Sequence, residues 1–257
     1  MKNLIMKVVS VALVGAMGFA IAGCGSSAKK LTVEEGKLIM ATNAFFPPYE
    51  FYEGDRIVGI DQEIASEVAT RLGLELEIQD IEFDSIVAGV QSGKYDIGCA
   101  GMTVTEDRLK SVNFTVSYAT GIQSVIVMED SAITDVDTLI SGEYVVGVQQ
   151  GTTGDIYMTD EIGDDRIERF NKGADAVLAL TNGQVDAVVI DDQPAQAFVD
   201  ANEGLTILST PYAIEDYAMC VNKDNEELLN KINEALNAMI ADGTVAAIIE
   251  EYIPSNG

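Results

Sequence analysis

The 257-residue sequence contains no histidine and no tryptophan, only three cysteines, and only 15 lysine plus arginine residues against 42 aspartate plus glutamate residues. Without histidine, the chain can form neither a serine–histidine catalytic triad nor a histidine-ligated metal site. Three cysteines are too few for a disulfide framework. The formal net charge of −27 argues against nucleic acid and anionic lipid surfaces as partners. We therefore expect no metal, no cofactor and no nucleic-acid partner.

The amino terminus has the features of a secretory signal peptide. Lys2 and Lys7 precede the apolar run VVSVALVGAMGFAIAG, which is too short to span a bilayer comfortably. The run leads into IAGC, which ends at Cys24 and resembles a bacterial lipobox. The resemblance implies a signal peptide over residues 1–23, diacylglycerol on the Cys24 sulfur, and a lipid-anchored polar linker over residues 24–36. The alternative is an ordinary secreted protein with an incidental cysteine.

From residue 37 onward, strand-like and helix-like segments alternate, which is typical of an α/β protein. KLIMATN (37–43) predicts a buried strand. In the helix-like segment 59–73, apolar residues four apart form one face, and Asp61 is placed to cap the helix. Cys99 and Cys220 each lie in a short apolar run, so we expect buried free thiols, although a bond between the two stays open.

Two stretches ninety residues apart, VAGVQSGKYDIGCAG (87–101) and VLALTNGQVDAVVID (177–191), align without a gap. Each reads as the end of a helix, a glycine, a polar residue and a strand that contains an aspartate. Two matching helix–turn–strand units predict two similar α/β lobes. The matched positions are Gly93 with Gly183, Asp96 with Asp186, and Gly101 with Asp191.

Four loops follow the carboxyl ends of predicted strands, two from each half of the chain. They are AFFPP (44–48), the loop that begins at Gly101, QGTTGD (150–155) and the loop that begins at Asp191. Open α/β sheets bind ligands at the carboxyl ends of their strands. We therefore expect the four loops to face one crevice between the lobes.

Six segments in order give a resemblance that covers residues 37 to about 252. They are ATNAFFPPYEF, GIDQEIASEVATRLG, FDSIVAGVQSGKYDI, AGMTVTEDR, VGVQQGTTGD and GQVDAVVID. Together they resemble bacterial extracellular solute-binding proteins of the polar-amino-acid class, which feed ABC importers. Gln62 departs from the pattern, where an apolar residue is usual.

The resemblance implies an α/β, two-lobed periplasmic-binding-protein fold of type II, with two α/β lobes joined by a two-strand hinge. It places residues 37–119 and 218–253 in lobe 1 and residues 120–217 in lobe 2. It implies an extracytoplasmic protein, lipid-anchored to the bacterial cell membrane, that carries a small-molecule amino acid to an ABC transporter permease. We expect a monomer.

A free α-amino acid carries a carboxylate and an ammonium group, and the site must complement both. Arg108 can grip a carboxylate with two hydrogen bonds. The resemblance implies this role, helped by the Thr103 amide and the Thr153 backbone. The alternative for Arg108 is a surface pairing with Glu106 or Asp107.

Asp191 is the complement for the ammonium group, joined by the carbonyl of Ala100 or Gly101 and by the Thr103 hydroxyl. Its neighbour Asp192 should point to the opposite side of the strand. The alternative role, a cap for the helix that follows, suits Asp192 better than Asp191.

The side chain of the ligand is expected to meet two rings and two amides. The resemblance implies Phe46 and Phe83 as a platform for its apolar stem, and the alternative is that both belong to the lobe core. Asn43 and Gln149 can each donate and accept hydrogen bonds, and neither is charged. We therefore expect a neutral polar amino acid such as glutamine, with arginine or lysine as the runner-up.

Two other functions occur on the same fold. Paired carboxylates could support lyase or dehydratase chemistry, but no such pair stands out across the predicted cleft. A sensor domain needs a transmembrane and signalling extension, which this chain, ending in IPSNG, would have to obtain from a partner. We therefore expect a binding protein without catalytic residues.

Overall fold

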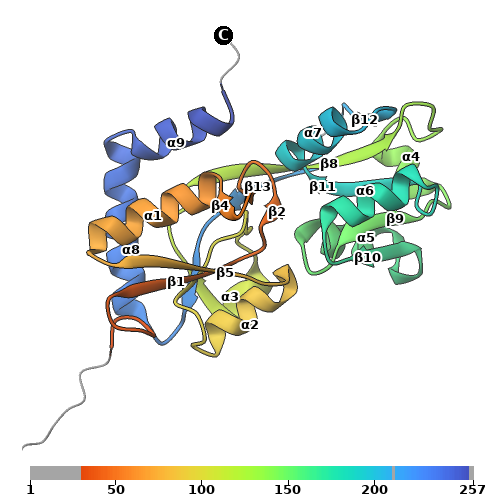
Figure 1. Ribbon diagram of the computed structural model, residues 1–257. Helices are drawn as coiled ribbons and strands as arrows, with labels where there is room; N and C mark the ends of the chain where they lie inside the picture. Colours follow the sequence, from red (N-terminus) through yellow and green to blue (C-terminus); the bar gives the residue numbers. More distant parts are fainter. Residues whose placement is uncertain (1–29, 210–211, 255–257) are drawn as a thin grey trace, which may run out of the picture.

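The protein is built on two main β-sheets, in a computed structural model that describes residues 30–209 and 212–254 (Figure 1). In spatial order, the strands of the first sheet are β5 (Glu75–Asp80), β1 (Lys37–Thr42), β6 (Ile97–Gly98), β14 (Cys220–Asn222) and β7 (Val112–Phe114). β1 runs parallel to β5 and β6, and β14 is antiparallel to β6 and β7. β1 is buried from Leu38 to Thr42, as expected for a strand covered on both faces.

The second sheet is mixed in the same way. Its strands are β10 (Ile167–Phe170), β9 (Val146–Gln149), β11 (Ala187–Asp191), β8 (Ala119–Met128) and β12 (Leu205–Ile207), with β13 (Ala213–Tyr217) also paired to β8. β9 is parallel to β10 and β11, whereas β8 is antiparallel to β11, β12 and β13. A small antiparallel sheet follows β1 and consists of β2 (Phe45–Phe46), β3 (Glu50–Glu53) and β4 (Arg56–Val58).

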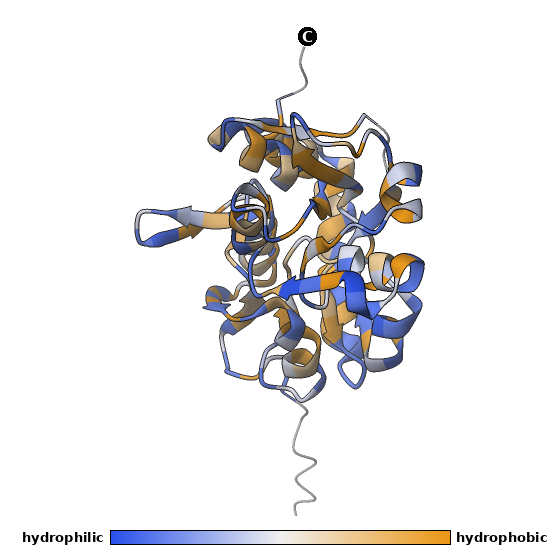
Figure 2. Cartoon of the chain, turned by 90° about the vertical axis from the view of Figure 1, so that its right-hand side faces the viewer, coloured by the Kyte–Doolittle hydropathy of each residue, from blue (hydrophilic) through white to orange (hydrophobic). Residues whose placement is uncertain are grey.

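Helices cover both sheets, and apolar residues gather in the interior between the layers (Figure 2). The helical elements around the first sheet are α1 (Ile60–Leu72), η1 (Phe83–Ser85), α2 (Ile86–Gln91), α3 (Glu106–Ser111), α8 (Glu226–Ala241) and α9 (Thr244–Tyr252). Those around the second sheet are α4 (Val136–Ser141), α5 (Thr153–Ile162), η2 (Asp164–Arg166), α6 (Gly173–Thr181) and α7 (Asp192–Ala201). Within the described residues, no single helix is long and apolar enough to cross a membrane; α8 and α9 pass that test only as a pair bent by 74°.

The predicted apolar face of α1 is confirmed, but the predicted cap is wrong. Ile60, Ile64 and Val68 are fully buried in the core. The helix begins two residues earlier than a cap at Asp61 requires, because Gly59 occupies the cap position. The Asp61 carboxylate is instead buried, where it accepts hydrogen bonds from the Gly101 N–H at 2.7 Å and the Tyr118 hydroxyl at 2.9 Å.

The repeat found in the sequence corresponds to two equivalent structural units, α2 with β6 and α6 with β11. The glycines that end the helices, Gly93 and Gly183, have left-handed φ values of 73° and 67°. Asp96 accepts the Ile39 N–H at 2.8 Å, just as Asp186 accepts the Val145 N–H at 2.8 Å. Each aspartate therefore fastens the start of its strand to the neighbouring parallel strand.

The chain passes between the two sheets along the antiparallel pair β8–β13, which Figure 1 shows running from one half of the molecule to the other. β8 continues from β7 of the first sheet, and β13 leads back into β14 of the same sheet. These crossings fit those that the resemblance implies near residues 120 and 217. We propose residues 37–119 with 218–253 as lobe 1 and residues 120–217 as lobe 2.

Two further expectations concern the linker and the cysteines. Within the predicted linker, residues 31–36 pack against the body, because the Val33 N–H donates to Asp96 at 2.8 Å and Asn225 donates to the Leu31 carbonyl at 2.9 Å. That part is not a free tether. The signal peptide and Cys24 lie outside the described residues. Cys99 and Cys220 are free and buried, as expected.

Candidate functional site

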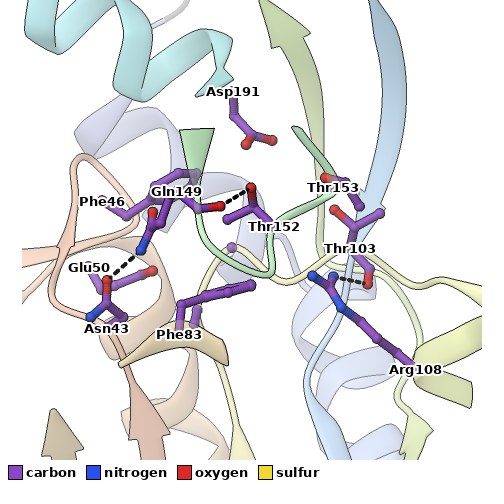
Figure 3. A pocket seen from close by; sticks show the side chains of 12 residues that line it. Asn43, Phe46, Glu50, Phe83, Thr103, Arg108, Gln149, Thr152, Thr153 and Asp191 are labelled. Carbon is purple, nitrogen blue, oxygen red and sulfur yellow. Dashed lines mark hydrogen bonds between the residues drawn. The ribbon is translucent and has the colours of Figure 1, made fainter. Parts of the chain in front are cut away.

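One pocket lies between the two sheets. The structure brings all ten predicted ligand contacts together in its wall, and Figure 3 shows most of their side chains. Their contact with a ligand remains a prediction. The lining residues are Asn43, Phe46, Glu50, Phe83, Ala100, Gly101, Thr103, Arg108, Gln149, Thr152, Thr153 and Asp191.

The pocket lies at the carboxyl ends of four strands, two from each sheet. Asn43 follows β1 and Ala100 follows β6, whereas Gln149 ends β9 and Asp191 ends β11. This is the edge at which open parallel sheets bind their ligands. The predicted crevice therefore corresponds to a real pocket.

Arg108 is held in place by hydrogen bonds from both halves of the molecule. It lies in the first turn of α3, where the Thr105 hydroxyl caps the helix by accepting the Arg108 N–H at 3.2 Å. Its Nη1 donates to the Thr103 carbonyl at 2.7 Å, and its Nη2 donates to the Gly151 carbonyl at 3.1 Å. Its guanidinium carbon lies 5.3 Å from the centre of the Phe83 ring.

The alternative of a surface pairing for Arg108 is wrong. Only 9% of Arg108 is exposed, and among the described residues no carboxylate lies within ion-pair distance of it. Burial lowers the pKa of the guanidinium, and the nearby Glu215 opposes that shift. A buried cation without a direct counter-charge favours an anionic ligand group.

The amino terminus of α5 faces the same end of the pocket. Thr152 caps this helix, since its hydroxyl accepts the Asp155 N–H at 3.3 Å. The first N–H groups of a helix have no intrahelical acceptors and attract anions. Gly151 has a φ of 76°, a conformation that favours glycine. The Thr153 N–H is therefore available for a carboxylate beside Arg108.

Asp191 lies at the opposite side of the pocket and does not cap α7. It occupies the position before the helix, but its side chain accepts a hydrogen bond from the Tyr217 hydroxyl. Burial raises the pKa of Asp191 to about 7, while the bond from Tyr217 opposes the shift and Glu215 adds to it. Asp192 is the first residue of α7, so the alternating geometry of a strand does not describe it.

The two predicted amides bind each other across the pocket. Gln149 Nε2 donates to Asn43 Oδ1 at 2.9 Å and to the Asn171 carbonyl at 3.1 Å, and Asn43 Nδ2 donates to the Ile81 carbonyl at 2.8 Å. An apolar ligand would therefore not leave both amides unpaired, which removes one argument for a neutral polar ligand.

The Thr103 hydroxyl has a partner within the protein, since it donates to Glu215 at 3.2 Å. Its oxygen can still accept a hydrogen bond from an ammonium group, so the predicted contact stays a prediction. Phe46 and Phe83 line the pocket and also belong to two hydrophobic core clusters. The two rings therefore lie in the pocket wall and in the hydrophobic core at the same time.

Comparison with known proteins agrees with this geometry. The sequence pattern of the bacterial extracellular solute-binding proteins, family 3, matches residues 38–255. The chain belongs to this family. It is similar to the arginine-binding extracellular protein ArtP of Bacillus subtilis, with 32% identity over 244 residues, which cover 91% of this chain and 92% of ArtP.

Two solved structures have the same fold. An ancestral arginine-binding protein bound to glutamine has a TM-score of 0.81 at 35% identity, covering 86% of this chain and 100% of its own. The amino acid ABC transporter substrate-binding protein AbpA of Streptococcus pneumoniae, bound to L-arginine, has a TM-score of 0.78 at 31% identity, covering 84% and 94%. The two-lobed periplasmic-binding-protein fold predicted from the sequence is confirmed.

Sequence reasoning missed two residues that line the pocket of this solute-binding protein, Thr152 and Glu50. Glu50 is 1% exposed, and its Oε2 has no hydrogen-bond partner among the described residues. Burial first, and then the neighbouring Asp61, raise the pKa of Glu50 well above its usual range. Glu50 pairs with Phe46 across β2–β3. The β2–β3 hairpin could have indicated Glu50 from the sequence, but β2 has only two residues and is too short to show the alternation of buried and exposed residues that is typical of a strand.

Proposed function

We propose that the protein is the extracytoplasmic binding component of an amino acid ABC importer, and that its preferred ligand is L-arginine. The charged residues that line the pocket are Glu50, Asp191 and Arg108, which together carry one net negative charge when all are ionised. Arginine carries one net positive charge. Arginine and lysine are therefore the common amino acids whose charges match those of the pocket one for one.

The observation that carries this choice is the Glu50 carboxyl group. It is buried in the pocket wall with one oxygen unpartnered among the described residues, and a buried charge without a partner is costly. A guanidinium group can donate two parallel hydrogen bonds to a carboxylate. Phe46 and Phe83 offer ring faces nearby, which attract cations.

The main-chain groups of the ligand would bind at the two other charges. The carboxylate meets Arg108 and the Thr153 N–H, and the ammonium group meets Asp191 and a carbonyl of Ala100 or Gly101. Because Arg108 and Asp191 belong to opposite halves, one zwitterion completes both contacts only when the halves approach. The ligand then shifts the population toward the closed form, as is usual for two-lobed binding proteins.

Glutamine is the second candidate, because the solved ancestral arginine-binding protein contains glutamine. The raised pKa of Glu50 supports it, since a protonated Glu50 makes the side-chain end of the pocket neutral. The two ligands therefore differ in whether Glu50 is ionised in the complex. The relatives reported above are binding proteins by name, which argues against the lyase and dehydratase alternatives.

The lipid anchor forms part of the same proposal. Cleavage before Cys24 and acylation of its sulfur would hold the protein at the outer face of the cell membrane, within reach of a permease. The body would act there as a monomer that delivers its ligand in the closed form.

Calorimetric titration with arginine, lysine, citrulline, glutamine, glutamate and leucine tests the proposed ligand. We expect arginine to bind most tightly and to be recovered unchanged by chromatography. Citrulline is the sharpest comparison, because it has nearly the shape of arginine without the charge. Tightest binding of glutamate or leucine would contradict the proposed pocket, and conversion of the ligand would indicate an enzyme.

The variant Glu50→Gln isolates the decisive residue. It should lose affinity for arginine by a factor of about 30 or more, since a desolvated charge pair contributes on the order of 2–5 kcal/mol, and should bind citrulline about as well as the parent. Glu53→Gln is the matched control, because Glu53 lies on the same strand but is exposed and pairs with Arg56. Equal losses for arginine and citrulline in Glu50→Gln would favour glutamine as the ligand.

A further inference from the structure

Glu215 is a buried charged residue that does not line the pocket. It lies on β13, where exposed and buried residues alternate: Ile214 is 75% exposed, and Glu215 is 5% exposed. Asp216 is exposed again, and Tyr217 is buried. A carboxylate on the inner face of a strand is stable only if several donors surround it.

One oxygen of Glu215 joins three separate segments of the chain. Oε2 accepts hydrogen bonds from Thr153 Oγ1 at 2.9 Å, Gln123 Nε2 at 2.9 Å and Thr103 Oγ1 at 3.2 Å. Thr103 follows β6 of the first sheet, Thr153 begins α5 beyond β9 of the second sheet, and Gln123 lies on β8. Figure 3 shows the two threonines side by side next to Arg108.

The charge of Glu215 also acts on both Arg108 and Asp191. It opposes the lowering of the Arg108 pKa, and it contributes to the raised pKa of Asp191. Burial, together with the nearby Glu215 carboxylate, raises the pKa of Tyr157 to about 12. Glu215 is thus hydrogen-bonded to both halves of the molecule. Its negative charge also affects Arg108 and Asp191, the two charged residues proposed to bind the main-chain groups of the ligand.

We propose that Glu215 is a positioning residue that holds Thr103 and Thr153 together in the closed cleft and thereby sets how slowly a bound amino acid leaves. This inference rests on the proposed function. Since the two threonines belong to different halves, the single oxygen that accepts both hydroxyls links the halves beside the proposed main-chain site of the ligand. Their hydroxyl protons are donated to Glu215, so toward the main-chain groups of the ligand these hydroxyls can only accept, and any donor must come from the backbone. The effect is therefore the same for ligands that differ only in their side chains.

The test compares Glu215→Ala and Glu215→Gln with the parent, and uses Asp216→Asn as a matched control from the exposed face of the same strand. The chain contains no tryptophan, so tryptophan fluorescence cannot report ligand release. Release is instead followed with radiolabelled arginine and citrulline during a chase with unlabelled ligand. Losing hydrogen bonds to a charged group should accelerate release about tenfold or more in Glu215→Ala, and less in Glu215→Gln, which keeps an acceptor oxygen. Association rates and the control should not change.

The outcomes separate this inference from the proposed function. A parent protein that binds no amino acid overturns both. A parent that binds, with Glu215 variants that release ligand at the parent rate, overturns only the role of Glu215. Faster release of one ligand but not of the other also overturns that role, since Glu215 would then act on the side chain. Circular dichroism checks that each variant is folded, and the isosteric Glu215→Gln carries the test if Glu215→Ala unfolds.

Discussion

Asp191 should make ligand affinity depend on pH between 5 and 8. Burial raises the pKa of its carboxyl group to about 7. A bound ammonium group favours the ionised form, so binding must expel the proton that the free protein holds. We therefore expect proton release on binding, even for a ligand whose side chain does not titrate.

The size of the effect follows from the ionised fraction of Asp191. With a pKa of about 7, that fraction falls from about one half at pH 7 to about 1% at pH 5. Affinity should fall about 50-fold over the same range, or about 2.3 kcal/mol. Calorimetric titration with citrulline or glutamine measures this directly. Enthalpies compared in phosphate and Tris buffers should give about half a proton released per ligand at pH 7.

Without ligand, the same group has the opposite effect on folding stability. The folded-state pKa of Asp191 lies above its unfolded value of 3.8, so its contribution to stability is complete below about pH 4 and is lost as pH rises through about 7. The ligand-induced rise in Tm should therefore grow from pH 5 to pH 8. Asp191→Asn should bind weakly and without this pH dependence. An affinity for citrulline that stays constant from pH 8 to pH 5 would refute the reasoning.

The remaining predictions use the same assays. Arg108→Ala should stay folded by circular dichroism but lose ligand-induced thermal stabilisation, at a cost of about 2–5 kcal/mol in binding; normal binding would exclude Arg108 as a ligand contact. Tyr217→Phe removes a bond that lowers the pKa of Asp191, so the midpoint of the affinity profile should move above pH 7, and an unmoved midpoint would contradict this. Arginine should release more protons than citrulline at pH 7 if Glu50 ionises to meet it, and equal release would favour glutamine. Cys24→Ser should abolish labelling by radioactive fatty acid in a bacterium, whereas persistent label would exclude the anchor at Cys24.

The parts of the fold that the sequence predicted are those set by local pattern. Apolar residues four apart identified the inner face of α1, and the glycine–aspartate repeat identified the ends of α2 and α6 with the strands that follow. The error at Asp61 has a physical cause. An aspartate near a helix start is usually a cap, but the nearby Gly101 N–H and Tyr118 hydroxyl are distant in sequence and compete for the carboxylate.

The sequence predicted which residues line the site, but it did not predict which of their side chains bind each other. Strand ends and the resemblance indicated which positions meet, because the topology fixes them. The partners of the polar side chains depend on contacts across the cleft: Gln149 donates to Asn43, and the Thr103 hydroxyl donates to Glu215. Glu50 escaped notice for the same reason, since its place in the wall depends on a short hairpin rather than on a strand of the main sheets.

The repeat explains how one sequence pattern, used twice, can supply two unlike halves of a site. Asp96 and Asp186 do the same work in both units, but five residues later the units differ. Gly101 has a φ of 49°, and a Cβ there would lie 2.6 Å from the Phe46 ring, so its place favours glycine. The matched position in the other unit is Asp191, and both line the pocket. In the proposed complex, a backbone carbonyl from one unit and a carboxylate from the other share one ammonium group. Neither unit holds both, so ammonium binding itself requires the cleft to close.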